Sequence, residues 1–184
     1  MKKLFLFFTG FALTLLGIFV VLPQAVTLLG FSGERFFSGE LWRILSFPLA
    51  HISFAHLSEN LLALFVVTLL AYELELSFKQ FLFIFALTGI VIAFFSGIFF
   101  PSLLLAGSSL GIYSLFGALS LKEQEVLPKS LFLGIFGIII FLNVAYTLYT
   151  SNDYVQPAYH AAGFIGGIAL VGLTQLRRKK RILQ

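Results

Sequence analysis

Long apolar runs alternate with short polar segments along this chain of 184 residues. A helix that crosses a membrane needs about 20 predominantly apolar residues, and most of the runs are close to that length. The pattern predicts an all-α polytopic membrane protein with six transmembrane helices, at about residues 4–22, 57–76, 78–100, 107–121, 130–150 and 158–176. We expect these helices to form a single domain that covers residues 1–184.

The composition changes this picture little. Hydrophobic residues make up 59% of the chain and charged residues 11%, which is more apolar surface than a small soluble core can hide. The chain has no cysteine, so disulfides and thiolate metal sites are excluded. The first run, behind Lys2 and Lys3, resembles a signal peptide, but it is long and no small-x-small cleavage site follows. We therefore expect it to remain as a helix.

The basic residues are distributed unevenly between the predicted loops. If the N-terminus is cytoplasmic, ten of the twelve lysines and arginines lie in inside segments, and only Arg35 and Arg43 lie outside. The positive-inside rule therefore favours both termini in the cytoplasm. The basic run at residues 177–181 is then a cytoplasmic anchor beside membrane lipid, and nucleic acid is not expected as a partner.

Polar clusters interrupt the apolar runs at the starts of three predicted helices. They are His51, His56 and Asn60; Gly107, Ser108 and Ser109; and His160 with Gly163. Polar and ionisable groups inside a bilayer are costly, so they mark candidate functional sites. With the N-terminus inside, the second, fourth and sixth helices all begin at the outer face. The three clusters should then lie at similar depth, where they can converge.

The predicted fourth helix is unusually short. Its 15 residues span about 22 Å at 1.5 Å per residue, whereas the hydrocarbon core is about 30 Å thick. Because Lys122 fixes the inner end, Ser109 should lie several ångströms below the outer surface. The preceding apolar stretch at residues 99–106 contains Pro101 and should be irregular, which is tolerated only in protein or beside a wet cavity. We therefore predict a water-accessible pocket with Ser109 at its floor.

Glycines at four-residue spacing predict close packing between the fourth and sixth helices. Gly107 and Gly111 form one such pair, and Gly163 and Gly167 form the other. Small residues allow helix backbones to approach closely in lipid. Close approach of these two helices would bring the serine cluster within reach of the C-terminal histidine.

These residue types suit acyl-transfer chemistry. A serine hydroxyl becomes a strong nucleophile when a base takes its proton, and a neutral imidazole such as that of His160 is the usual base. His56 and Asn60 are four residues apart on one helix face, from which they can donate hydrogen bonds to an oxyanion. Ser108 is an alternative nucleophile to Ser109, although it lies about 100° away around the helix.

Taken together, these positions resemble the rhomboid family of intramembrane serine proteases. The resemblance covers residues 41–173 in order, and the combination is specific although each piece alone is weak. The matching motifs are Trp42-Arg43, His51, His56-x-x-x-Asn60, Gly107-x-Ser109 and His160-x-x-Gly163-Phe164-x-x-Gly167.

The resemblance implies a role for each main site residue. Ser109 would be the nucleophile and His160 the general base, in a dyad without an acid. His56 and Asn60 would form the oxyanion hole together with the Ser109 amide. Tyr113 matches the position whose ring packs against the catalytic histidine. No metal and no cofactor is implied.

Other positions would support the site or depart from the pattern. His51 and Trp42-Arg43 match a first outer loop that is half embedded in the membrane, while Gly107 and Gly163 belong to the catalytic motifs. The fifth helix and residues 150–157 would act as gate and cap. Leu110 stands where the family most often has glycine.

The expected function is cleavage of transmembrane segments of other membrane proteins, near their outer ends. The resemblance implies a multi-pass protein of a prokaryotic inner membrane, with its active site open to the outer face. Leu110 keeps one alternative open, a catalytically inactive rhomboid-like protein that binds membrane clients. A more distant alternative is a small transporter or proton relay that uses His56, His160 and Glu73.

Overall fold

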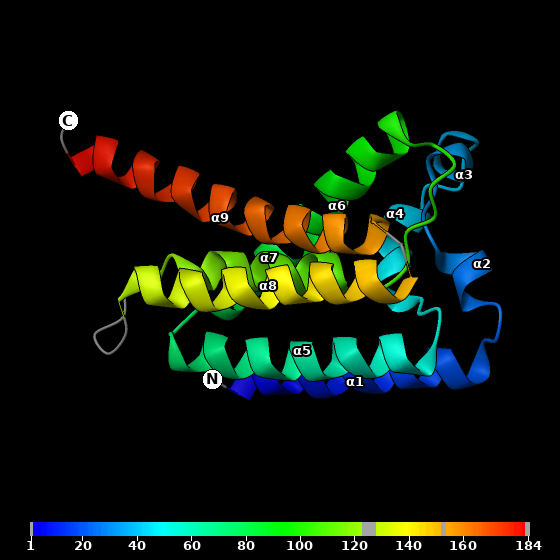
Figure 1. Ribbon diagram of the computed structural model, residues 1–184, viewed down its shortest axis with the longest axis horizontal. Helices are drawn as coiled ribbons and strands as arrows, with labels where there is room; N and C mark the ends of the chain where they lie inside the picture. Colours follow the sequence, from blue (N-terminus) through cyan, green and yellow to red (C-terminus); the bar gives the residue numbers. More distant parts are fainter. Residues whose placement is uncertain (1, 123–127, 152–153, 183–184) are drawn as a thin grey trace.

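Helices make up nearly all of the regular structure. The computed structural model describes residues 2–122, 128–151 and 154–182 (Figure 1). The long helices in these ranges are α1 (Lys2–Val21), α5 (Phe54–Glu73), α6 (Phe78–Phe99), α7 (Ser109–Ser120), α8 (Lys129–Ser151) and α9 (Val155–Ile182). Shorter pieces are α2 (Ala25–Leu29), α3 (Gly33–Phe37), α4 (Arg43–Ser46) and the 3₁₀ turn η1 (Phe47–Leu49).

The long helices occupy the places that the apolar runs predict, with shifted ends. By length and composition, α1, α5 and α6 can each cross a membrane, while α7 and the apolar part of α8 are shorter. Helix α5 begins three residues earlier than expected because Ser53 caps it, its Oγ accepting from the His56 N–H at 3.1 Å. The all-helical fold is confirmed, and the six crossings and cytoplasmic termini remain predictions.

The irregular stretch before the fourth helix is also found. Helix α6 ends at Phe99 and α7 begins only at Ser109, so residues 100–108 lack helical structure. The loop expected at residues 150–157 includes residues 152 and 153, which lie outside the described residues. On either side of them, α8 continues to Ser151 and α9 begins at Val155.

Helix α7 lies at the centre of the bundle. All of its residues after Ser109 are buried except Tyr113, which is half-buried. It packs against α5, α6, α8 and α9, with α9 as its main neighbour, while α1 covers α5. The short helices α2, α3 and α4 gather at one end of the bundle, and α1 begins and α9 ends at the other (Figure 1).

Glycines set the close approach of α7 and α9, but they are not all the expected ones. A Cβ on Gly167 would lie 1.9 Å from the Ser114 carbonyl oxygen, and one on Gly117 would lie 2.0 Å from that of Phe164. The prediction that Gly111 faces the last helix is wrong, because a Cβ there would meet Phe85 of α6 at 2.6 Å. Gly107 lies outside the helix altogether.

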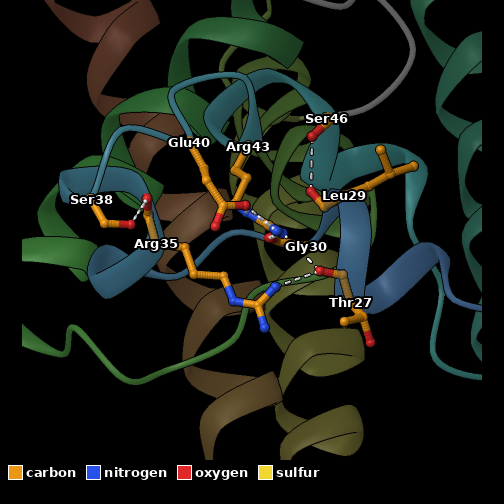
Figure 2. Close-up of polar contacts among 8 residues, drawn as sticks. All are labelled: Thr27, Leu29, Gly30, Arg35, Ser38, Glu40, Arg43 and Ser46. Carbon is orange, nitrogen blue, oxygen red and sulfur yellow. Dashed lines mark hydrogen bonds and ion pairs between the residues drawn. The ribbon is translucent and has the colours of Figure 1, made fainter.

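The segment between α1 and α5 is organised around a buried arginine. Arg43 is 3% exposed, and its Nη1 donates to the carbonyls of Gly30 at 2.7 Å and Thr27 at 3.0 Å. Its Nε donates to Glu40 Oε2 at 2.6 Å (Figure 2). Trp42, by contrast, is 54% exposed. One guanidinium therefore joins α2 to the chain before α4, which the sequence pattern alone did not predict.

This outer segment supports the loop that leads to α7. Phe31 and Leu105 exchange backbone hydrogen bonds of 2.9 and 2.7 Å, and the Glu34 N–H donates to the Pro101 carbonyl at 3.0 Å. Gly33 lies so close to α6 that a Cβ would be 2.0 Å from the Gly97 oxygen. The outer segment and the loop at residues 100–108 therefore form one packed unit.

Candidate active site

Gly107 shapes the approach to Ser109. Its φ of +111° belongs to the left-handed region, where glycine is favoured. Its N–H donates to the Phe47 carbonyl at 3.0 Å, which ties the loop to η1. A Cβ at this position would lie 2.7 Å from His56 Cε1. The glycine therefore both permits the turn and leaves room for the His56 ring immediately before Ser109.

The three polar clusters of the sequence meet at one cavity. A cavity of about 420 Å³ is lined by His56, Asn60, Ser109, Tyr113 and His160, which come from α5, α7 and α9. The rest of its lining consists mostly of apolar side chains of α5, α7, α8 and α9, together with the polar side chains of Glu59, Asn143 and Gln156. An adjoining cavity of about 250 Å³ on the loop side is also lined by Ser109 and His56.

His160 is held on its ring face and at one nitrogen. The ring is 5% exposed and stacks on Tyr113, with centroids 4.2 Å apart and planes 10° from parallel. Its Nδ1 lies 3.0 Å from Asn143 Oδ1 of α8. Its Nε2 is buried and has no hydrogen-bond partner among the described residues. The stacking predicted for Tyr113 is therefore present, and the Ser109–His160 hydrogen bond is not formed in this structure.

The predicted oxyanion donors share one face of α5. Asn60 is 4% exposed, and its Nδ2 donates to the His56 carbonyl at 2.9 Å, which leaves its second amide hydrogen available. His56 is half-buried and borders both cavities. Since Ser109 is the first residue of α7, its backbone N–H lies in the first turn, where amides lack intrahelical partners.

His51 stands behind His56 rather than in the cavity lining. The two rings have centroids 5.2 Å apart at an interplanar angle of 58°. His51 is 4% exposed, and neither ring nitrogen has a hydrogen-bond partner among the described residues. Burial, and secondly the neighbouring His56, lowers the pKa of His51 from 6.5 to about 4. The side chain is therefore neutral at physiological pH.

The two neighbouring serines have different surroundings. Ser109 is half-buried at the cavity, whereas Ser108 is 1% exposed. The Ser108 Oγ has no partner in the described part of the chain, and Ser108 borders a separate, mainly apolar cavity of about 120 Å³. This placement supports Ser109 over Ser108 as the candidate nucleophile, in agreement with the motif.

Leu110 is accommodated by the core. It is 3% exposed and packs with Phe31, Phe47, Ala93 and Leu105 beneath the outer segment. It also borders the smaller of the two site cavities. The residue that departs from the family pattern therefore joins the loop unit to the bundle.

Sequence reasoning missed Asn143 and the burial of Arg43. Asn143 is an amide in the middle of an otherwise apolar run, and that contrast is the signal that was available.

Within the described residues, no three His, Asp or Glu side chains gather as a metal ion would require.

Comparison with known proteins identifies the family. The Rhomboid domain family model matches residues 38–177. Rhomboid protease GluP of Bacillus subtilis strain 168 is 34% identical over 134 residues, which is 70% of this chain. The aligned part is 25% of that relative, so the chain spans about a quarter of its length. The family match covers most of the chain and includes all three polar clusters, so this integral membrane protein belongs to the rhomboid family.

Proposed function

We propose that this protein is an intramembrane serine endopeptidase that cleaves transmembrane segments of other membrane proteins near their outer ends. The observation that carries the proposal is the common cavity of Ser109, His160, His56 and Asn60. Family membership and the name of the GluP relative, a rhomboid protease, support it. The resemblance of the sequence motifs to the rhomboid family implies the same roles for these residues.

The proposed reaction begins at the free nitrogen of the histidine. His160 Nε2 takes the proton of the Ser109 hydroxyl as the oxygen attacks a peptide carbonyl. The Ser109–His160 hydrogen bond, which is open in this structure, is proposed to form when substrate binds, since catalytic hydrogen bonds are often long before that step. The oxyanion accepts hydrogen bonds from the Ser109 N–H and from the side chains of His56 and Asn60. His160 then protonates the leaving amine.

Release of the acyl-enzyme requires water at the same place. The smaller cavity reaches Ser109 from the side of the outer loops and has Ser53 and Gln156 in its lining. Water that enters there attacks the acyl carbonyl, with His160 again as the base. We propose that this route opens to the outer face of a prokaryotic inner membrane. The proposed topology is a single domain of six spans with both termini cytoplasmic.

The substrate helix is proposed to enter sideways between α5 and α8. The larger cavity has an apolar wall of Leu62 and Val66 from α5 and Ile139 from α8, which suits a transmembrane segment. In the described structure, the main packing of α8 is against α7 and α9. Helix α8, with the segment that follows it, is therefore the proposed gate and cap.

An inactive rhomboid-like protein that binds membrane clients is the second candidate. The observations that favour it are Leu110 in the position after Ser109 and the open Ser109–His160 pair. The same apolar cavity would then hold a client helix without cleaving it. Serine reactivity separates the two candidates.

Labelling with a fluorophosphonate in detergent tests the proposal. We expect labelling of the wild type, loss of labelling in Ser109→Ala and retention in the matched control Ser108→Ala, because Ser108 is buried away from the cavity. Cleavage of a reconstituted transmembrane substrate should follow the same order. A wild type that stays unlabelled beside a competent rhomboid would establish the inactive alternative.

A further inference from the structure

Asn143 is a polar side chain of α8 that contacts the proposed catalytic base. Its Oδ1 lies 3.0 Å from His160 Nδ1, within ordinary hydrogen-bond range. The preceding residue, Leu142, is 58% exposed, whereas Asn143 is half-buried and borders the larger cavity with Ser109 and His160. The helix therefore turns this amide inward to the site, beside Ile139 and Ile140 of the same cavity, and turns Leu142 outward.

The chemistry of this contact fixes the state of the imidazole. An amide oxygen only accepts hydrogen bonds, so His160 Nδ1 donates and carries the ring proton when the ring is neutral. The lone pair then belongs to Nε2, the nitrogen without a partner among the described residues. A base that accepts the proton of Ser109 needs this tautomer, because the opposite one would present an N–H to the hydroxyl.

We propose that Asn143 is a positioning residue for the Ser109–His160 dyad, so that the site works as a triad whose third member comes from α8. The inference rests on the proposed serine protease function and deepens it. Asn143 orients the ring in its plane, while Tyr113 restricts the ring face by stacking. Two contacts from different helices therefore define both the tilt and the rotation of one imidazole.

The hydrogen bond should also strengthen during the reaction. Once His160 has taken the Ser109 proton, both ring nitrogens carry hydrogen and the ring is cationic. A hydrogen bond from a charged donor is roughly twice as strong as a neutral one. Asn143 therefore stabilises the transition state more than the resting enzyme, which raises kcat rather than substrate affinity. A role limited to helix packing would not produce this difference.

Three variants of the full chain test the inference. Asn143→Leu removes the acceptor, while Asn143→Asp keeps an oxygen at the same position. The exchange N143L/L142N keeps the composition of α8 but moves the amide about 100° around the helix, away from His160. Each is measured for cleavage of a reconstituted transmembrane substrate and for the rate of fluorophosphonate labelling, beside wild type and Ser109→Ala. Thermal unfolding in detergent identifies any variant that fails to fold.

We expect kcat and the labelling rate to fall about tenfold in Asn143→Leu and in the exchange variant, with KM within about twofold. Tenfold corresponds to about 1.4 kcal/mol, the size of one hydrogen bond. Asn143→Asp keeps an acceptor oxygen and should retain activity within about threefold of the wild type. If Asn143→Leu does not fold, the activity of Asn143→Asp is the measurement that tests the inference. In ¹⁵N spectra of labelled histidine, Asn143→Leu should move the ring proton of His160 from Nδ1 to Nε2.

The outcomes separate this inference from the function on which it rests. An active wild type that depends on Ser109, with Asn143→Leu or the exchange variant at full activity, overturns only the positioning role. A loss that appears in KM alone, or an unchanged histidine spectrum, overturns it too. A wild type that neither labels nor cleaves overturns the proposed function, and the triad with it.

Discussion

Gly167 is the position where a single methyl group should separate the two halves of the proposed dyad. A Cβ on this residue would lie 1.9 Å from the Ser114 carbonyl oxygen and 2.7 Å from its carbon. Both atoms belong to the backbone of α7, so neither can rotate away. An ordinary contact at 3.4 Å requires α7 and α9 to move apart by about 1.5 Å.

That displacement should reach the site because α9 is continuous. His160 lies seven residues before Gly167, about 10 Å along the same helix. A misplacement of about 1 Å between reacting groups can cost about 100-fold in rate. We therefore expect Gly167→Ala to lower kcat by about 10- to 100-fold. Overpacking of a close helix contact should also lower the free energy of unfolding by about 1–3 kcal/mol.

Gly172 offers a matched control on the same helix. A Cβ there meets no atom within 4 Å, so Gly172→Ala should keep full activity and gain up to about 1 kcal/mol from helix propensity. Both variants are compared by cleavage of a reconstituted substrate and by thermal unfolding in detergent. If Gly167→Ala matches Gly172→Ala in kcat and in unfolding temperature, the close contact does not set the geometry of the site.

Three further changes address the outer segment and its loop. Gly107→Ala should lower activity and cost about 1–3 kcal/mol in unfolding free energy, because it adds a clash with His56 to the strain of φ +111°. Gly39→Ala has the same φ with open space around it, so equal activity losses in the two would contradict a role for the clash. Arg43→Lys keeps the charge but loses the fork that reaches three acceptors, and should cost about 1–3 kcal/mol in thermal unfolding; a wild-type unfolding temperature would refute this. The pKa of His51 is about 4 in the folded protein against 6.5 when unfolded, so the unfolded chain takes up a proton first as the pH falls. The free energy of unfolding should therefore be full above pH 6.5 and lower by up to about 3 kcal/mol once the pH reaches about 4. The free energy of unfolding, measured from pH 4 to 8, should depend less on pH in His51→Gln than in the wild type. An equal pH dependence in the two proteins would show that other groups cause it.

The meeting of the polar clusters could be predicted because it depends on quantities that sequence records directly. Hydropathy gives the number and approximate limits of the long helices, and their alternation puts every second helix start at the same end of the bundle. The short fourth helix follows from the same count, since Gly107 and Lys122 bound its apolar run. These properties depend only on position along the helix axis, which follows from the residue count and a rise of about 1.5 Å per residue.

Rotation about the axis is what the sequence left open. Nearly every side of α8 is apolar, so no periodic pattern indicates which side faces α9, and the inward direction of Asn143 had to come from the structure. Gly111 shows the same difficulty. A small residue permits close helix approach, but it does not indicate which helix approaches, and here the neighbour is α6. The segment at residues 25–49 was missed for another reason: helices of four or five residues carry too little periodicity to be recognised.

The unequal attachment of the three helices around His160 bears on how the proposed gate works. Helices α7 and α9 meet backbone to backbone at Gly117 and Gly167, so their separation is fixed by hard contacts. In the described part of the chain, helix α8 contacts the histidine through Asn143, whose Oδ1 accepts a hydrogen bond from His160 Nδ1. A movement of α8 that admits a substrate would thus release the Nδ1 of the base while leaving the Ser109–His160 scaffold in place. Return of α8 would restore the reactive tautomer, so cleavage should follow closure, and a substrate that holds α8 open should bind without being cut.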